Sequence, residues 1–164
     1  MVKIDKETAF SILENVKDPE IPLLSIIDMG ILRDFYYDNN KAIAVITPTY
    51  SGCPAMTMIS DMVKDELVKA GLENVEVISQ ISPAWTTEWM SEKAKSNLKA
   101  SGIAPPIKMQ MTELFNIKFN DDKIECPFCN SNNTKKTSEF GSTACKSLHY
   151  CNECSQPFDY FKCI

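Results

Sequence analysis

Long apolar runs are missing from this sequence, and glycine and histidine are scarce. Its 164 residues include 5 glycines and 1 histidine. No uninterrupted apolar run approaches the roughly 20 residues that a helix needs to cross a bilayer. The opening residues Met1 to Lys6 also lack the apolar core of a secretory signal. We therefore expect a cytoplasmic protein that does not associate with membranes.

A surplus of positive charge is missing as well. The formal net charge is −5, with 10 basic and 15 acidic residues before Pro105 and equal numbers of each after it. Proteins that bind nucleic acid through phosphate neutralisation need an excess of Lys and Arg on one face. The charge distribution therefore argues against DNA or RNA as a partner.

The sequence also lacks a recognisable catalytic arrangement. No glycine-rich phosphate loop, Ser-His-Asp order or paired acid and base is evident. The single histidine, His149, has no nucleophile with which the sequence pairs it. We therefore expect no enzymatic activity and assign no catalytic residue.

What is present indicates a folded chain in two parts. Hydrophobic residues make up 44% of the chain, and six of the seven cysteines lie in its last 39 residues. The stretch Ser101 to Pro106 combines a helix stop with Pro-Pro, which is typical of a connector, so a linker is expected at about residues 101–110. We predict one domain over residues 1–104 and a second over residues 105–164.

The front domain has the alternating pattern of a small α/β (α+β) unit. Helical spacing of apolar residues and strand-like runs between turn residues define its elements. The expected helices span residues 7–16, 54–70 and 88–100, and the expected strands span residues 26–37, 41–47 and 75–81. Asp38-Asn39-Asn40 predicts that the first two strands form a hairpin.

Two cysteine pairs in the tail have the spacing of a zinc site. Cys126-Pro127-Phe128-Cys129 and Cys151-Asn152-Glu153-Cys154 are separated by 21 residues. Each C-x-x-C turn can direct two sulfurs at one ion, and two such turns complete a tetrahedral site with no open position for catalysis. A tail of this length also needs a metal to stabilise it. We predict a zinc ribbon with structural Zn²⁺ bound by Cys126, Cys129, Cys151 and Cys154.

Other uses of the tail residues stay open. A redox role for one C-x-x-C pair is the competing interpretation. Cys145 or His149 could replace one of the four ligands, or could serve only in packing, and Cys163 has no assigned role.

Cys53 stands alone in the front domain, in a loop before the helix predicted at residues 54–70. Pro54 fits the first helical position, which places Cys53 at or near the N-cap, where the helix dipole and free N–H groups favour a thiolate. This makes Cys53 a candidate reactive or metal-binding sulfur, although a lone cysteine can also be a small buried hydrophobe. Hydroxyls and carboxylates that could assist it belong to Thr47, Thr49, Ser51, Asp18, Glu20 and Asp28.

Three segments of the first half resemble SufT-type iron–sulfur assembly factors: Asp18-Pro19-Glu20-Ile21-Pro22, Ser25 to Ile31, and Thr47 to Pro54. Three later segments, Pro83 to Met90, Phe140 to Lys146 and Pro157 to Cys163, extend the likeness over nearly the whole chain. In full, the sequence resembles the PaaD (PaaJ) family of accessory proteins in bacterial phenylacetate degradation.

The resemblance implies an iron–sulfur-assembly-like front domain, a C-terminal zinc ribbon, and a role in maturing the phenylacetyl-CoA epoxidase. Its implied client is the iron–sulfur reductase component. Cys53 corresponds to the signature cysteine of the assembly domain, so it is the expected ligand of a transient iron ion or Fe–S cluster. One form of this hypothesis has two copies of the chain share the cargo as a homodimer.

Two alternatives stay open beside this maturation role. The chain could be a non-catalytic adaptor or structural subunit of the oxygenase complex, with Cys53 merely packed. It could also be a thiol oxidoreductase that uses a C-x-x-C pair.

Overall fold

The computed structural model describes residues 3–107 and 124–162. The chain divides into two compact units, one ending at Ala94 and the other beginning at Lys95, and each is described here by itself. Within the described residues, no helix has the length and apolar character to cross a bilayer. The first unit is α+β and the second is a β-sheet unit that carries a cluster of four cysteines, which confirms the predicted fold class.

A three-stranded sheet forms the centre of the first unit, in the order β1-β2-β3. Strands β1 (Leu32–Asp38) and β2 (Lys41–Ile46) form the predicted antiparallel hairpin. At its turn, Asn39 and Asn40 both have positive φ, at 46° and 64°. Asparagine tolerates this conformation, which matches the twist of the flanking strands.

Strand β1 begins six residues later than predicted. The residues before it form a series of turns, and Gly30 has φ of +68° there. A left-handed glycine breaks the extended conformation, so the apolar run at Ile26 and Ile27 does not join the strand.

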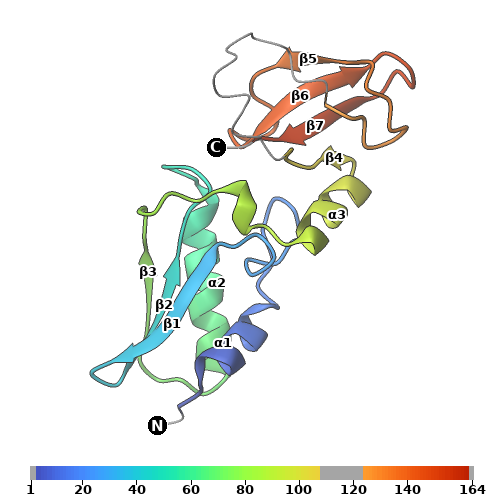
Figure 1. Cartoon of the computed structure of the whole chain (residues 1–164). Coiled ribbons are helices and arrows are strands. Elements are labelled where there is room, and N and C mark those ends of the chain that lie inside the picture. Colours follow the sequence, from blue (N-terminus) through green and yellow to red (C-terminus); the bar gives the residue numbers. More distant parts are fainter. Residues whose placement is uncertain (1–2, 108–123, 163–164) are drawn as a thin grey trace. The chain divides into compact units, whose positions relative to one another are not determined.

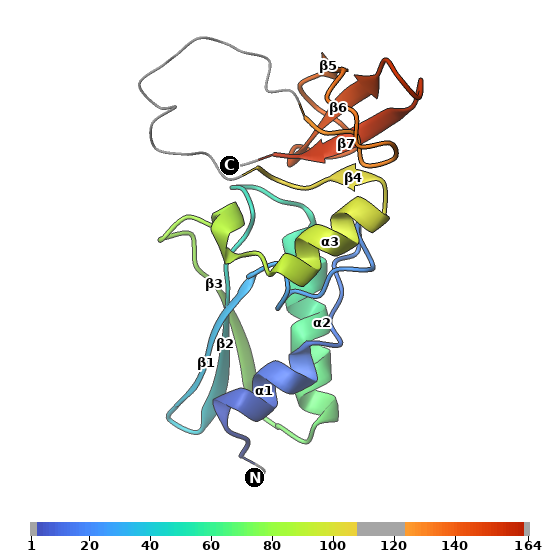
Figure 2. The ribbon, with the colours of Figure 1, turned by 45° about the vertical axis from the view of Figure 1, so that its right-hand side comes forward.

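Helices α1 (Lys6–Leu13) and α2 (Ala55–Lys69) lie on one face of this sheet (Figure 1 and Figure 2). Asp5 caps α1, because its carboxylate accepts a hydrogen bond from the Thr8 N–H at 2.7 Å. Helix α2 buries Ile59, Val63 and Leu67, which recur at four-residue spacing, toward the core. The predicted helix over residues 54–70 is therefore confirmed.

Strand β3 (Val75–Ser79) returns parallel to β2, as expected for strands joined by a helix. A short 3₁₀ helix, η1 (Thr87–Trp89), comes next, and α3 (Glu92–Ala100) follows it. The predicted helix over residues 88–100 thus begins four residues late. The Ser91 hydroxyl accepts a hydrogen bond from the Ala94 N–H at 2.9 Å, which is the pattern of an N-cap.

The second unit contains a four-stranded sheet in the order β4-β7-β6-β5. Strands β5 (Thr134–Ser138), β6 (Lys146–Cys151) and β7 (Pro157–Phe161) form an antiparallel meander, and β4 (Ile103–Ala104) pairs parallel with β7. The linker expected at residues 101–110 therefore contains a strand of the second unit. Its remaining residues from 108 onward lie outside the described residues.

Candidate metal centre and signature loop

The four predicted zinc ligands come together in the second unit. Cys126 and Cys129 lie at a turn before β5, Cys151 is the last residue of β6, and Cys154 lies on the turn between β6 and β7. The four sulfurs all lie within 4.8 Å of one another. The Sγ–Sγ distance is 3.7 Å for Cys126 and Cys154 and 3.5 Å for Cys129 and Cys151. Four thiolates at about 2.3 Å from a tetrahedral ion lie about 3.8 Å apart, so this donor set fits a metal ion.

Each C-x-x-C turn forms a knuckle, Cys126 to Cys129 in the first and Cys151 to Cys154 in the second. Backbone hydrogen bonds fix the shape of each knuckle. In the first, the Asn130 N–H donates to the Cys126 carbonyl at 2.9 Å, and Asn130 has φ of +60°. In the second, the Cys151 N–H donates to the Gln156 carbonyl at 3.0 Å, and Ser155 has φ of +58°. The left-handed residue after the second cysteine of each pair turns the chain back, which lets both sulfurs point to one side.

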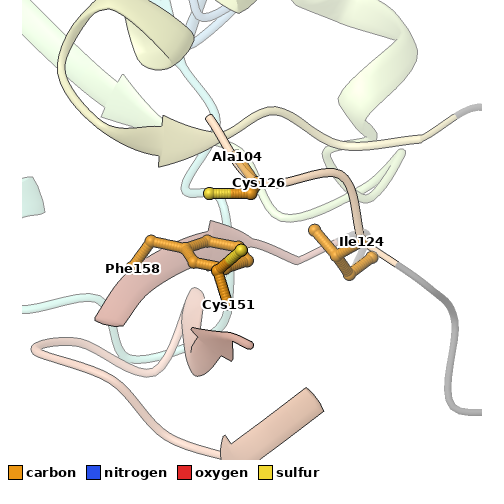
Figure 3. Packing of buried hydrophobic residues seen from close by; sticks show 5 residues of the cluster. All are labelled: Ala104, Ile124, Cys126, Cys151 and Phe158. Carbon is orange, nitrogen blue, oxygen red and sulfur yellow. The ribbon is translucent and has the colours of Figure 1, made fainter. Parts of the chain in front are cut away.

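The metal centre is also part of the core of its unit. Cys126 and Cys151 are fully buried and pack with Ala104, Ile124 and Phe158 (Figure 3). Because two of the four ligand sulfurs belong to this cluster, a metal ion bound to them would also stabilise the packing of the described part of the unit.

The two thiols of the second knuckle have opposite protonation behaviour. Backbone N–H groups of Cys154 and Glu153 donate to the Cys151 sulfur and lower its pKa to about 7. Burial raises the pKa of Cys154 to about 12. A bound divalent cation favours the thiolate form of every ligand, so occupation of the site displaces protons and weakens at acid pH.

Cys145 and His149 lie in the same unit but outside the four-sulfur group. Cys145 is buried, with its Sγ 3.0 Å from the Thr143 hydroxyl. His149 is buried on β6, where its Nε2 lies 3.0 Å from the Ser147 hydroxyl and its ring stacks on Phe158. Both side chains therefore have polar partners outside the four-sulfur group, the Thr143 hydroxyl for Cys145 and the Ser147 hydroxyl for His149. Cys163 lies outside the described residues.

Cys53 lies in the loop between β2 and α2 of the first unit and is half-buried. Its carbonyl accepts a hydrogen bond from the Met56 N–H at 3.3 Å, and Pro54, the cap of α2, already has helical dihedral angles. Ser51, Gly52 and Pro54 are exposed. The loop therefore holds this thiol at the start of a helix and within reach of a partner molecule.

The polar residues suggested as helpers of Cys53 have mostly structural roles. Thr47 and Thr49 are buried, and the Thr47 N–H donates to the Ile31 carbonyl at 2.8 Å. The Asp18 carboxylate accepts hydrogen bonds from the Glu20 and Ile21 N–H groups at 2.8 and 2.9 Å, which closes the Asp-Pro-Glu-Ile-Pro turn. The segment from Asp18 to Pro22 is therefore a turn that is stabilised by hydrogen bonds among its own residues.

Asp28 anchors a polar network that the sequence did not suggest. Its carboxylate accepts hydrogen bonds from the Ser25 and Ser91 hydroxyls at 3.0 and 2.8 Å, and the Lys93 Nζ lies 3.3 Å away. Burial opposes ionisation of this carboxyl, but the two hydroxyls and the Lys93 ammonium outweigh it and hold the pKa of Asp28 below its usual value. The network joins the Asp28 turn to the start of α3.

Two tryptophans reinforce the same junction. The Trp85 Nε1–H donates to the Met29 carbonyl at 2.9 Å, and the Arg33 guanidinium lies 3.5 Å from the centre of the Trp89 ring. The segments Ser25 to Ile31 and Pro83 to Met90 are therefore packed together. In the sequence, only one feature connects these two segments: both are among the stretches that resemble the PaaD family.

Replacing Asp28 by asparagine is expected to lower the free energy of unfolding by about 1–3 kcal/mol at pH 7, because the buried network loses its negative charge and one of its two acceptor oxygens becomes an NH₂ donor. A depressed pKa contributes stability above the unfolded value of the carboxyl, and this contribution is lost as pH falls through the folded value. The difference between wild type and Asp28→Asn should therefore shrink at acid pH. Urea unfolding followed by tryptophan fluorescence measures this, since both tryptophans lie in the first unit.

Asp34→Asn is the matched control. Asp34 pairs with Lys6 at 2.7 Å, but both side chains are about half exposed, so little stability depends on the pair. Equal losses in the two variants would contradict a special role for the Asp28 network.

Comparisons with known proteins agree with this geometry. Residues 6–79 match the family described as "Iron-sulfur cluster assembly protein", and residues 112–162 match the "PaaD zinc beta ribbon domain". A crystal structure of a DUF59 domain from Bacillus anthracis has a TM-score of 0.52 and 34% identity, over 56% of this chain and 89% of that one.

Two curated relatives extend the comparison. "Fe-S protein maturation auxiliary factor YitW" of Bacillus subtilis is 34% identical over 92 residues, 55% of this chain and 89% of the relative. A putative 1,2-phenylacetyl-CoA epoxidase subunit of Escherichia coli K12 is 40% identical over 155 residues, 94% of this chain and 91% of the relative. The fold and the four-cysteine site thus define a protein that joins an iron–sulfur assembly domain to a zinc ribbon. Within that class, the chain belongs to the PaaD family.

Proposed function

We propose that this chain is a non-catalytic maturation factor for the phenylacetyl-CoA epoxidase and delivers iron or an Fe–S cluster to it through Cys53. The observation that supports the proposal is that two different likenesses to known proteins occur in one chain. The first unit is similar to Fe–S protein maturation factors, and the whole chain is similar to a protein named as an epoxidase subunit.

The two cysteine sites suit different tasks. The four-cysteine centre is closed and integrated in a hydrophobic core, which favours a resident structural Zn²⁺. Cys53 is a single half-buried thiol in a loop whose neighbouring residues are exposed. A cargo held by one protein sulfur leaves its other ligand positions to small thiols, to a second copy of the chain or to the client. Release is therefore easier from Cys53 than from the closed centre.

The client in this proposal is the iron–sulfur reductase component of the epoxidase, with the ribbon as the docking unit. Cys53→Ser is expected to lower the iron and acid-labile sulfide of that reductase to the level of a strain that lacks this chain, because serine is a poor ligand for iron in a sulfur environment. Both contents are measured on reductase purified without oxygen from cells that express each variant.

Cys145→Ser is the matched control. This cysteine is also a free thiol, but it is buried and lies outside both sites, so the reductase should keep its cluster. Unchanged cluster content with Cys53→Ser, at equal amounts of the variant in the cell, would show that Cys53 carries no cargo.

An adaptor role is the second candidate, because the Escherichia coli relative is named as a component of the epoxidase. An adaptor would co-purify stably with the oxygenase components, and Cys53→Ser would change neither the complex nor its cluster content. This outcome would replace the carrier proposal.

A further inference from the structure

The four sulfurs of the metal centre differ in their access to solvent. Cys126 and Cys151 are fully buried, Cys154 is half-buried, and Cys129 is exposed. The exposed Phe128 side chain precedes Cys129 on the same turn, so the outer end of the first knuckle faces solvent. A small oxidant in solution therefore meets the Cys129 sulfur before the others.

The exposed sulfur has a close neighbour on the other knuckle. The Sγ atoms of Cys129 and Cys151 are 3.5 Å apart. A disulfide bond is about 2.05 Å long, so closing this pair requires an approach of about 1.5 Å. The exposed sulfur and a fully buried sulfur are thus placed to form a bond between the two knuckles.

We propose that Cys129 is a peroxide-sensitive residue whose oxidation opens the metal centre by forming a Cys129–Cys151 disulfide. The inference rests on the occupied four-cysteine site of the proposed function. In the first step, the Cys129 thiolate attacks one oxygen of hydrogen peroxide; the O–O bond breaks, hydroxide leaves, and Cys129 becomes a sulfenic acid. In the second, the Cys151 thiolate attacks the Cys129 sulfur, the S–O bond breaks, and a second hydroxide leaves.

The step is balanced as a two-electron exchange. Two thiolates are oxidised, one peroxide is reduced to two hydroxides, and no other reagent is required. After it, only Cys126 and Cys154 remain as thiolate ligands. Because two ligands hold a divalent ion far more weakly than four, the ion leaves the site. The burial of Cys151 in the small apolar cluster couples this loss to the packing of the second unit.

The test uses the full chain with Cys53→Ser, so that this second accessible thiol does not compete. The zinc-loaded protein is treated with one equivalent of hydrogen peroxide under argon. Released zinc is followed with a chromogenic chelator, and disulfides are mapped by mass spectrometry after alkylation. We expect about one zinc released per disulfide formed, with the Cys129–Cys151 peptide pair as the first product.

The order of oxidation at the intact site sharpens the outcome, because loss of any one ligand is expected to unfold the second unit. With less than one equivalent of peroxide, the Cys129–Cys151 pair should form before any other disulfide, while Cys126 and Cys154 stay reduced. A first disulfide within one knuckle, or first oxidation at buried Cys126, would overturn the proposal. The same disulfide is expected with any resident divalent ion that is not itself oxidised. A resident metal other than zinc would therefore contradict the assignment of zinc, but not the proposed oxidation of Cys129.

Discussion

Replacing Cys151 by serine is expected to unfold the second unit while the first unit keeps its structure. Cys151 provides one of four sulfurs at the metal centre and is also a fully buried member of the apolar cluster. Structural zinc contributes on the order of 10–16 kcal/mol in zinc-finger peptides, which exceeds the stability that a unit of this size reaches without a metal. Amide hydrogen exchange of β5, β6 and β7 measures the effect, and we expect protection in these strands to be lost.

Cys145→Ser provides the control for this prediction. Cys145 is buried in the same unit, but it lies outside the four-sulfur group, and its Sγ contacts the Thr143 hydroxyl, which can also pair with a serine hydroxyl. This variant should keep its metal and its protected strands. Persistent protection of β6 in Cys151→Ser would show that the unit folds without the fourth thiolate.

Gly30→Ala is expected to lower the free energy of unfolding of the first unit by about 2–5 kcal/mol. Gly30 has φ of +68°, which costs about 1–2 kcal/mol for a residue with a Cβ. A Cβ there would also lie 2.6 Å from the Trp89 Cβ and 2.7 Å from the Trp89 carbonyl oxygen. Relief of such a clash requires movement of backbone at the junction with Met29 and Trp85, and overpacking typically costs about 1–3 kcal/mol. Urea unfolding monitored by tryptophan fluorescence gives the difference.

Gly52→Ala isolates the cost of the backbone conformation. Gly52 has φ of +86°, but no atom beyond its two chain neighbours lies within 4 Å of the position of an added Cβ. Its loss should therefore stay near 1–2 kcal/mol. Similar values for the two variants would mean that the contact between Gly30 and Trp89 contributes little to stability.

The contacts of Asp28, Gly30 and Trp85 show that the first unit extends beyond strand β3. The match to the assembly family ends at residue 79, whereas Trp85, Trp89 and Ser91 all contact the turn at residues 28–30. The segment after β3 is therefore an integral part of this unit, and truncation at the end of the family match would expose the Met29 carbonyl and the Asp28 carboxylate.

Features governed by local chemistry could be predicted from the sequence. The two C-x-x-C turns, the Asn39-Asn40 hairpin and the amphipathic α2 each depend on residues within one or two turns of chain, so spacing and side-chain type were sufficient. The placement of Cys53 before α2 followed from Pro54 for the same reason, although its role remains a proposal. Element boundaries were less accurate, because the start of β1 and of α3 depends on Gly30 and Ser91.

Sequence alone thus determined the two-part organisation, the metal-binding knuckles and the family. Only the tertiary structure decided that β4 pairs with β7, that Asp28 contacts Ser91 across 63 positions, and that Cys129 is exposed while Cys151 is buried. These outcomes depend on which distant surfaces meet when the core is packed. A one-dimensional pattern contains the propensity of each element, but burial and pairing are properties of the assembled unit.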